Sequence, residues 1–264
     1  MADVPFGRLV WKIRYRWRKM LSASFARRPR RWPADRPFVS FTFDDFPRTA
    51  ALVGGRTLEE HGVRGTFYAS FGLMGTDSVE GPLFTADDAR ELLAKGHEIG
   101  CHTHDHLDAW DTPGRAFDDS VVRNAAAAAR ILPGLVLETL SYPKAQPRPS
   151  AKRAAGRHFA CSRGGGQALN TGTVDLNALN SCFIDKRNRE NAAYFQEIID
   201  RNARLNGWLI FSTHDLGPSP SDFGCRPEFL EDIVGRAAAS GAVVLPVRDV
   251  YRRVFGEADR QERA

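Results

Sequence analysis

Short apolar runs alternate with longer amphipathic stretches from Pro37 almost to the end of the sequence. The apolar runs are rich in β-branched and aromatic residues, and their length is typical of buried strands. Seven strands are predicted, at residues 38–43, 65–70, 97–101, 136–142, 159–162, 208–213 and 242–247. Helical signals occupy several of the intervals, at residues 86–95, 116–132, 189–205 and 227–239.

Repeated alternation of strand and helix predicts a parallel sheet covered by helices. About seven such units suit a closed or nearly closed barrel. We therefore predict an α/β fold, a distorted (β/α) barrel of about seven units, over residues 37–254. A polar C-terminal tail is expected at residues 255–264.

The first 36 residues form a basic arm with a different pattern. On a helix of 3.6 residues per turn, its cations lie on one side and its apolar side chains share an arc of about 120°. This N-terminal amphipathic basic helix is typical of a segment that lies on an anionic membrane, although the same stripe also fits a helix packed on the folded body. Residues 27–33, with two prolines among arginines, predict a linker. The apolar set of the arm is Phe6, Leu9, Val10, Ile13, Trp17, Met20 and Leu21.

The formal net charge of +5 is unevenly distributed, because residues 1–36 carry eleven Lys or Arg against two Asp. A basic arm on a mildly acidic body does not resemble a nucleic-acid-binding domain, which presents cations across a folded face. No apolar run reaches about 18 residues, so no membrane span is predicted. The N-terminal segment does not have the pattern of a secretory leader, because cations interrupt its apolar residues. We expect a cytoplasmic protein, with residues 6–21 as the segment that would contact the inner membrane face.

Chemistry-bearing residues gather where predicted strands end. Asp44 and Asp45 end the first strand, and His102 and His106 follow the third. Imidazoles spaced by four share one face of a helical turn. With an aspartate they supply three ligands for a divalent ion and leave a position for water. The second aspartate then lies where a base is needed, and His214 ends another strand at the same rim of the barrel.

These motifs resemble those of the polysaccharide deacetylases, carbohydrate esterase family 4 with the NodB-homology domain. The matching segments are GVRGTFY at residues 62–68, TFDD at 42–45, GHEIGCHTHDH at 96–106 and the late strand that ends at His214. The resemblance implies metal-dependent hydrolysis of an N-acetyl group on an amino sugar. It implies Asp44 as general base, His214 as general acid, and Asp45, His102 and His106 as metal ligands.

One divalent ion is expected, with zinc preferred and cobalt or nickel compatible with the same ligands. The implied substrate is an N-acetyl or N-formyl amino sugar in a polysaccharide, an oligosaccharide or a glycolipid precursor. The sequence leaves this choice and the oligomeric state open. His97 and His104 are predicted to be structural, because His97 begins its strand at the far rim and His104 is out of phase with both ligands.

The third family motif departs from its common form. Many members have Arg-Pro-Pro-Tyr-Gly where this chain has Tyr142-Pro143-Lys144, so the arginine that usually orients the base is absent. Arg163 and Arg187 are the two candidates to replace it. Tyr142 and Pro143 are predicted substrate contacts, and the main-chain N–H of Lys144 is a predicted oxyanion donor.

Three other functions fit parts of the pattern. A sugar- or metal-binding barrel that has lost turnover fits the altered third motif, but the intact acid, base and ligands favour catalysis. A non-haem iron oxygenase also uses two histidines and a carboxylate, yet it leaves Asp44 and His214 unexplained. A zinc protease requires a glutamate where this chain has Thr103.

Overall fold

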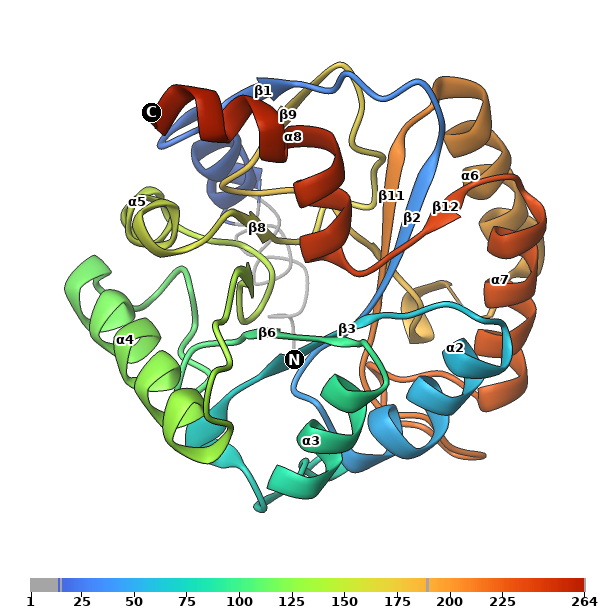
Figure 1. Ribbon diagram of the computed structural model, residues 1–264, viewed down its shortest axis with the longest axis horizontal. Coiled ribbons are helices and arrows are strands. Elements are labelled where there is room, and N and C mark those ends of the chain that lie inside the picture. Colours follow the sequence, from blue (N-terminus) through green and yellow to red (C-terminus); the bar gives the residue numbers. More distant parts are fainter. Residues whose placement is uncertain (1–13, 15, 189, 264) are drawn as a thin grey trace, which may run out of the picture.

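A curled parallel sheet is the centre of the computed structural model, which describes residues 14, 16–188 and 190–263. Eight strands pair in the order β10-β11-β2-β3-β6-β7-β8, with β12 also beside β2. The sheet forms a half-barrel with helices around its outside (Figure 1), so the predicted fold class is confirmed. The strands are β2 (Phe38–Phe43), β3 (Thr66–Ala69), β6 (Glu98–Cys101), β7 (Thr139–Ser141), β8 (Cys161–Arg163), β10 (Cys182–Phe183), β11 (Trp208–Thr213) and β12 (Val243–Val244).

The helices that cover the sheet include all four predicted ones. Thr85 begins α3 with a capping box that it shares with Asp88, as its position before an acidic first turn favours. The prediction omitted three of the described helices, namely α2 (Arg56–Glu60), α5 (Pro149–His158) and α8 (Val247–Arg263). The set is α2 (Arg56–Glu60), which continues a π-helix at Ala50–Gly55, then α3 (Ala86–Ala94), α4 (Gly114–Ile131), α5 (Pro149–His158), α6 (Ala192–Leu205), α7 (Pro227–Ala239) and α8 (Val247–Arg263).

The segment predicted as a linker is instead part of the folded body. Strand β1 (Pro29–Arg31) pairs antiparallel with β9 (Thr173–Asp175). Trp32 follows β1 and stacks on Trp208, with ring centroids 5.7 Å apart, and its Nε1 donates a hydrogen bond to the carbonyl of Asn206 at 2.6 Å. The linker prediction is therefore wrong, because a buried tryptophan and a strand pair fix this segment.

Helix α8 closes the end of the barrel opposite the carboxyl ends of the strands. The main-chain N–H of Arg248 donates a hydrogen bond of 2.8 Å to Glu98, which also accepts hydrogen bonds from two threonines at the starts of β3 and β7. The helix continues through residues 255–263, where a polar tail was predicted, and Phe255 is buried in the same cluster as Trp32 and Trp208.

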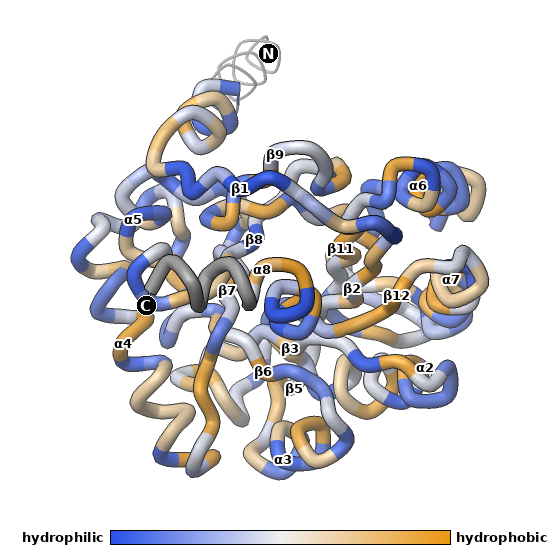
Figure 2. The backbone as a smooth tube through the Cα atoms, turned by 45° about the horizontal axis from the view of Figure 1, so that its top comes forward, coloured by the Kyte–Doolittle hydropathy of each residue, from blue (hydrophilic) through white to orange (hydrophobic). Residues whose placement is uncertain are grey.

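The N-terminal arm is helical over residues 16–24. Two side chains of the predicted apolar stripe face outward, since Trp17 is 58% exposed and Met20 is 49% exposed, whereas Leu21 is half-buried. Phe6, Leu9, Val10 and Ile13 of the predicted stripe lie outside the described residues. Figure 2 shows the described part of this helix standing out from the body beside β1 and α5. Within the described part of the chain, no helix is long and apolar enough to cross a membrane.

Candidate active site

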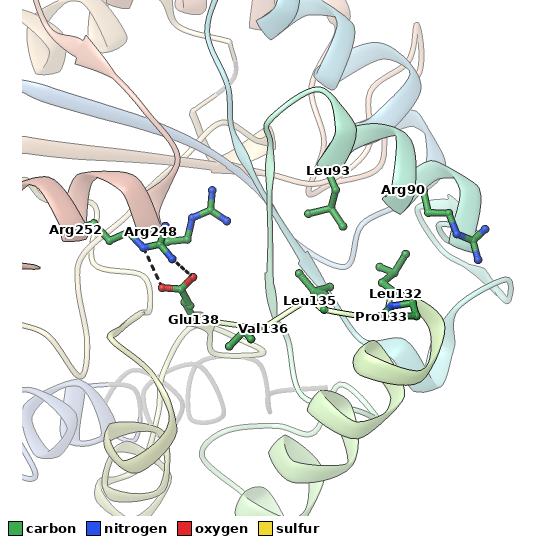
Figure 3. Close-up of a pocket in the computed structure, with 10 residues that line it drawn as sticks. Arg90, Leu93, Leu132, Pro133, Leu135, Val136, Glu138, Arg248 and Arg252 are labelled. Carbon is green, nitrogen blue, oxygen red and sulfur yellow. Dashed lines mark hydrogen bonds and ion pairs between the residues drawn. The ribbon is translucent and has the colours of Figure 1, made fainter.

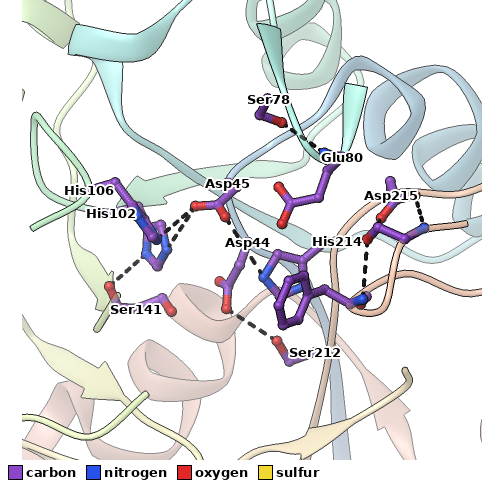
Figure 4. Close-up of polar contacts among 12 residues, drawn as sticks. Asp44, Asp45, Ser78, Glu80, His102, His106, Ser141, Ser212, His214 and Asp215 are labelled. Atoms are coloured by element: carbon purple, nitrogen blue, oxygen red, sulfur yellow. Dashed lines mark hydrogen bonds and ion pairs between the residues drawn. The ribbon is translucent and has the colours of Figure 1, made fainter. Parts of the chain in front are cut away.

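The three predicted metal ligands lie together at one rim of the barrel (Figure 4). Asp45 follows β2, whereas His102 and His106 follow β6. The carboxylate Oδ1 of Asp45 lies 3.3 Å from Nε2 of His102 and 3.1 Å from Nε2 of His106. One ligand atom from each of the three residues lies within 4.8 Å of the others. This spacing gives three donors around one point, the number that a catalytic metal site uses.

The two imidazoles converge through a loop, not through the predicted helical turn. Residues 102–106 have no helical hydrogen bonding, and Thr103 (φ 60°) and His106 (φ 51°) adopt the left-handed conformation. Asp45 does the same, with φ 56°. Such conformations are uncommon for residues other than glycine and cluster at functional sites. The backbone therefore bends sharply at both strand ends and turns the ligand side chains toward one another.

The protonation of His106 and of Asp45 suits metal binding. Nδ1 of His102 donates to the carbonyl of Ser141 at 2.8 Å, which leaves Nε2 free to face Asp45. Burial, followed by the charge of His102, lowers the pKa of His106 to about 4, so its ring is neutral at physiological pH. Burial raises the pKa of Asp45, but the hydrogen bond and the charge of His102 lower it by a larger amount. The net pKa lies below its usual value, so the carboxyl stays ionised. A neutral imidazole and an ionised carboxylate are the forms that bind a cation.

Asp44, the predicted base, is buried beside this group and is held by Arg163 at the end of β8. The guanidinium Nη2 of Arg163 donates to Oδ1 of Asp44 and, at 3.0 Å, to Ser212, whose hydroxyl donates to the other carboxylate oxygen at 3.3 Å. Burial raises the pKa of Asp44, but the charge of Arg163 and those of nearby histidines leave it below its usual value. Arg187 pairs instead with Asp185, so of the two candidates for the missing arginine only Arg163 contacts Asp44.

His214, the predicted acid, follows β11 and faces the ligand group from the opposite side. Its Nε2 lies 3.9 Å from Oδ2 of Asp45. Its Nδ1 donates to the carbonyl of Phe223 at 3.2 Å, and the Phe223 ring packs against the imidazole. The ring is therefore oriented by the following loop so that Nε2 points into the site.

Glu80 is a site residue that the sequence does not reveal. It lies in the hairpin formed by β4 (Asp77–Ser78) and β5 (Gly81–Pro82), far from any predicted strand end. Its carboxylate forms a second group of close donor atoms with Asp45 and His214, again within 4.8 Å. Burial and then the charge of Asp45 raise the pKa of Glu80 to about 8.

The loop after β7 contributes main chain more than side chains. Tyr142 is 1% exposed and its hydroxyl donates to the carbonyl of Asn177, so the phenol belongs to the core; Pro143 is also buried. Lys144 adopts a left-handed conformation with φ 59°. Its side chain is exposed and lies 3.5 Å from Asp108. Its main-chain N–H has no hydrogen-bond partner among the residues that the structure describes.

The other two histidines of the motif lie outside the ligand group. The main-chain N–H of Gly65 donates to Nδ1 of His97 at 3.0 Å, and Nε2 of His97 lies 3.3 Å from Glu59. His104 contacts Asp105 through Nδ1 at 2.8 Å. These contacts are consistent with the structural role predicted for both.

A cavity of about 590 Å³ lies elsewhere, between the C-terminal end of α4, the start of β7 and α8 (Figure 3). It contains none of the predicted site residues. Arg252 and Glu138 both line it and form an ion pair at 2.5 Å. The cavity therefore lies apart from the candidate site, at the opposite rim of the barrel.

Fold and site together define an α/β barrel with three convergent side chains of the kinds that bind metals. A second, buried carboxylate lies beside them, and a histidine lies across the site. The resemblance predicted from the motifs is confirmed, because residues 32–158 match the family model for polysaccharide deacetylase. The match includes all three members of the ligand group and ends before Arg163 and His214. No curated protein matches the chain significantly.

Solved structures share the fold at low sequence identity. A protein from Mycobacterium smegmatis assigned as a polysaccharide deacetylase is 15% identical, with a TM-score of 0.63 over 87% of this chain and 94% of the other. The chitin deacetylase of Colletotrichum lindemuthianum is 18% identical, with a TM-score of 0.59 over 81% and 88%. A family 4 pseudoenzyme from Bacillus anthracis is 11% identical, with a TM-score of 0.56 over 82% and 66%.

Proposed function

We propose that this protein is a metal-dependent carbohydrate N-deacetylase that hydrolyses an N-acetyl or N-formyl amide of an amino sugar. The observation that supports this most directly is the position of Asp44. A carboxylate held by Arg163 lies beside three convergent donors that could bind a metal. The family match and the fold of the structural neighbours support a carbohydrate deacetylase in general.

The donor set fits a divalent ion, with zinc the preferred candidate, held by Asp45, His102 and His106. When bound, such an ion polarises a carbonyl and lowers the pKa of water. The chain supplies the rest of the chemistry. Asp44 accepts the proton of the attacking water, and its contact with Arg163 keeps it ionised and oriented for this role.

Two further groups complete the proposed reaction. His214 donates a proton from Nε2 to the departing amine, which would otherwise leave as an unstable anion. The main-chain N–H of Lys144 is the proposed donor to the oxyanion. It has no hydrogen-bond partner in the described chain, and a main-chain donor requires no particular side chain. Acid and base thus flank the point where the amide carbon would lie.

Acetate release from chitotetraose by the zinc-loaded protein tests this function. Asp44→Asn should keep the metal and lower turnover by roughly 10²-fold or more, and His214→Ala should also lose turnover. The matched control is Asp87→Asn, because the Asp87 side chain is 91% exposed and remote from the site. Full activity of the metal-loaded Asp44→Asn protein would require another base.

A catalytically impaired barrel is the alternative function. The altered third motif favours it, and one structural neighbour is a family 4 pseudoenzyme that has a mutant with restored activity. The two proposals differ in one measurement. An impaired barrel would bind zinc and chitotetraose but release no acetate at any metal concentration, whereas the proposed enzyme releases acetate only when metal is present.

A further inference from the structure

A groove of about 810 Å³ lies beside the candidate site, with the N-terminal helix as one wall. The opposite wall is formed by loops that follow the carboxyl ends of β6, β7, β8 and β10, the same rim that carries the catalytic groups. Lys144 directly follows Pro143 of the third motif, and Gly164 directly follows Arg163. A chain of sugar units centred on Asp44 would therefore extend into this groove.

The groove is positively charged. Its lining has five cations, Arg18, Lys19, Arg27, Lys144 and Arg187, against two carboxylates, Asp108 and Asp175. Asp175 is paired with the buried ammonium of Lys152 at 2.7 Å. Three of the cations also have carboxylate partners, Arg18 with Asp111, Lys144 with Asp108 and Arg187 with Asp185, so the excess charge lies on the other two. Lys19 and Arg27 are exposed and form no ion pair with any residue that the structure describes. An excess of positive charge in a concave site attracts an anionic ligand.

The uncharged part of the lining is suited to sugars. Gln146, Thr171 and Asn180 are half-buried and line the groove with amide and hydroxyl groups, which pair with sugar hydroxyls. Trp110 adds an aromatic face, over which the guanidinium of Arg18 lies at 5.2 Å from the ring centroid. Arg18 is in turn fixed by Asp111 at 2.9 Å.

The N-terminal helix presents two different faces. Arg18, Lys19, Ser22 and Ala23 line the groove, whereas Trp17 and Met20 are exposed. The helix is joined to the body by the hydrogen bond of 2.6 Å from Nζ of Lys152 to the carbonyl of Ser22, and by β1 further along the chain. The wall that carries Arg18 and Lys19 is therefore held in place by contacts with the barrel.

We propose that this groove binds the anionic part of the substrate, a sugar unit with a carboxylate, on the same glycan as the amide that is hydrolysed. The substrate class is then an acidic polysaccharide or oligosaccharide, not a neutral one. This inference rests on the proposed function, because it takes the groove as an extension of the deacetylase site. Lys19 and Arg27, which have no partner of opposite charge in the described part of the chain, are the residues that recognise the carboxylates.

The test compares two tetrasaccharides in calorimetric titrations of the full zinc-loaded chain carrying Asp44→Asn, which blocks turnover. One alternates glucuronate with N-acetylglucosamine, and the other is neutral chitotetraose. The acidic sugar should bind about tenfold more tightly, a difference that corresponds to about 1.4 kcal/mol. Since surface charges are screened by salt, 0.5 M NaCl should reduce this preference to less than about threefold.

Charge reversal locates the effect. Lys19→Glu combined with Arg27→Glu should abolish the preference, and both side chains are exposed, so the fold should tolerate the change. The matched control is Arg130→Glu, an exposed arginine in the last turn of α4, which should retain the preference. Equal affinity for the two sugars, or a preference that survives the double reversal, would overturn the inference.

Failure of this inference is distinguishable from failure of the proposed function. Acetate release from both sugars by the wild-type chain, with no difference in affinity, would reject the acidic groove alone. Absence of acetate release from either sugar with metal present would reject the deacetylase. The titrations would in that case still show whether the groove prefers an anionic glycan.

Discussion

The guanidinium of Arg163 donates a hydrogen bond to the carboxylate of Asp44, although the two residues are 119 positions apart in the sequence. Both side chains are buried, and Arg163 also lies over the ring of Tyr68 at 4.9 Å from its centroid. A hydrogen bond between charged groups contributes about 1.5–3 kcal/mol. The orientation of the proposed base therefore depends on a residue outside its own motif.

Replacement of Arg163 should impair turnover without removing the metal. Arg163→Ala removes the charge-assisted hydrogen bond to Asp44, and we expect kcat to fall by about 10- to 100-fold. Added guanidinium should restore part of the activity, because it can occupy the vacated space and pair with Asp44. A variant that loses activity only by misfolding would gain nothing from guanidinium. Steady-state kinetics with metal analysis of the same sample separates these outcomes.

The metal content of histidine variants should follow the geometry of the site. His102→Ala and His106→Ala each remove one of three donors, so each should lose bound zinc after dialysis. His104→Ala is the matched control, because His104 lies in the same loop but contacts Asp105 instead of the ligand group. Elemental analysis measures this directly. One equivalent of zinc retained by His102→Ala or His106→Ala would contradict the ligand assignment.

His97 should make the free energy of unfolding depend on pH. Burial lowers its pKa to about 4 in the folded chain, below the ordinary value of 6.5. Between these pH values the unfolded chain binds more protons, so the protein loses stability as the pH falls from 6.5 toward 4. The slope from one group is at most about 1.4 kcal/mol per pH unit. Denaturant titrations should show a shallower slope for His97→Gln, and equal slopes would assign the pH dependence to other groups.

The outward face of the N-terminal helix should bind vesicles that contain anionic lipid. Trp17, Met20 and Phe25 are about half exposed, and cations flank them along the arm. Replacing all three by Ser should abolish cosedimentation with the vesicles, and salt should weaken the binding of the wild-type protein. Val136→Ser is the control, because Val136 is 71% exposed at the opposite rim. Undiminished cosedimentation of the triple variant would exclude this face.

Substitution tests the arm better than truncation does. A chain that begins at Pro37 would lack Trp32, which is buried against Trp208, and β1, which pairs with β9. It would also lack Arg28, whose main-chain N–H donates to Asp175 at 2.9 Å. Loss of vesicle binding by such a truncated chain would therefore report unfolding as readily as loss of a membrane contact.

The sequence predicts the parts of the fold that rest on strong local signals. Two strands occur with the predicted bounds, Phe38–Phe43 and Trp208–Thr213, because both are continuous apolar runs that are buried on every side. Helix Pro227–Ala239 also matches, since proline in its first turn and glycine after its end mark both limits. Helix α5 was missed because its buried face consists of alanines and Lys152, which give little hydrophobic periodicity.

The candidate site was predictable only where its residues share a motif or a strand end. Asp45, His102 and His106 were found in this way, and the structure places them together. The sequence left two candidates for the missing arginine. In the sheet β8 is four strands away from β2, so Arg163 reaches Asp44 only because the sheet curls into a half-barrel (Figure 1). Glu80 reaches the site from a short hairpin, where no periodicity or motif marks a carboxylate as close to His214.

The position of β2 in the sheet has a consequence for synthesis on the ribosome. This first strand of the barrel pairs with β11 and β12, whose residues Trp208 and Val243 lie opposite Phe38. Translation proceeds at about 5–20 residues per second, so β11 and β12 are synthesised on the order of ten seconds or more after β2. Although β3 pairs with the end of β2 earlier, the other edge of β2 has no strand partner during that interval. Ribosome-associated chaperones are therefore expected to contact the segment around Phe41 until the C-terminal part of the chain is complete.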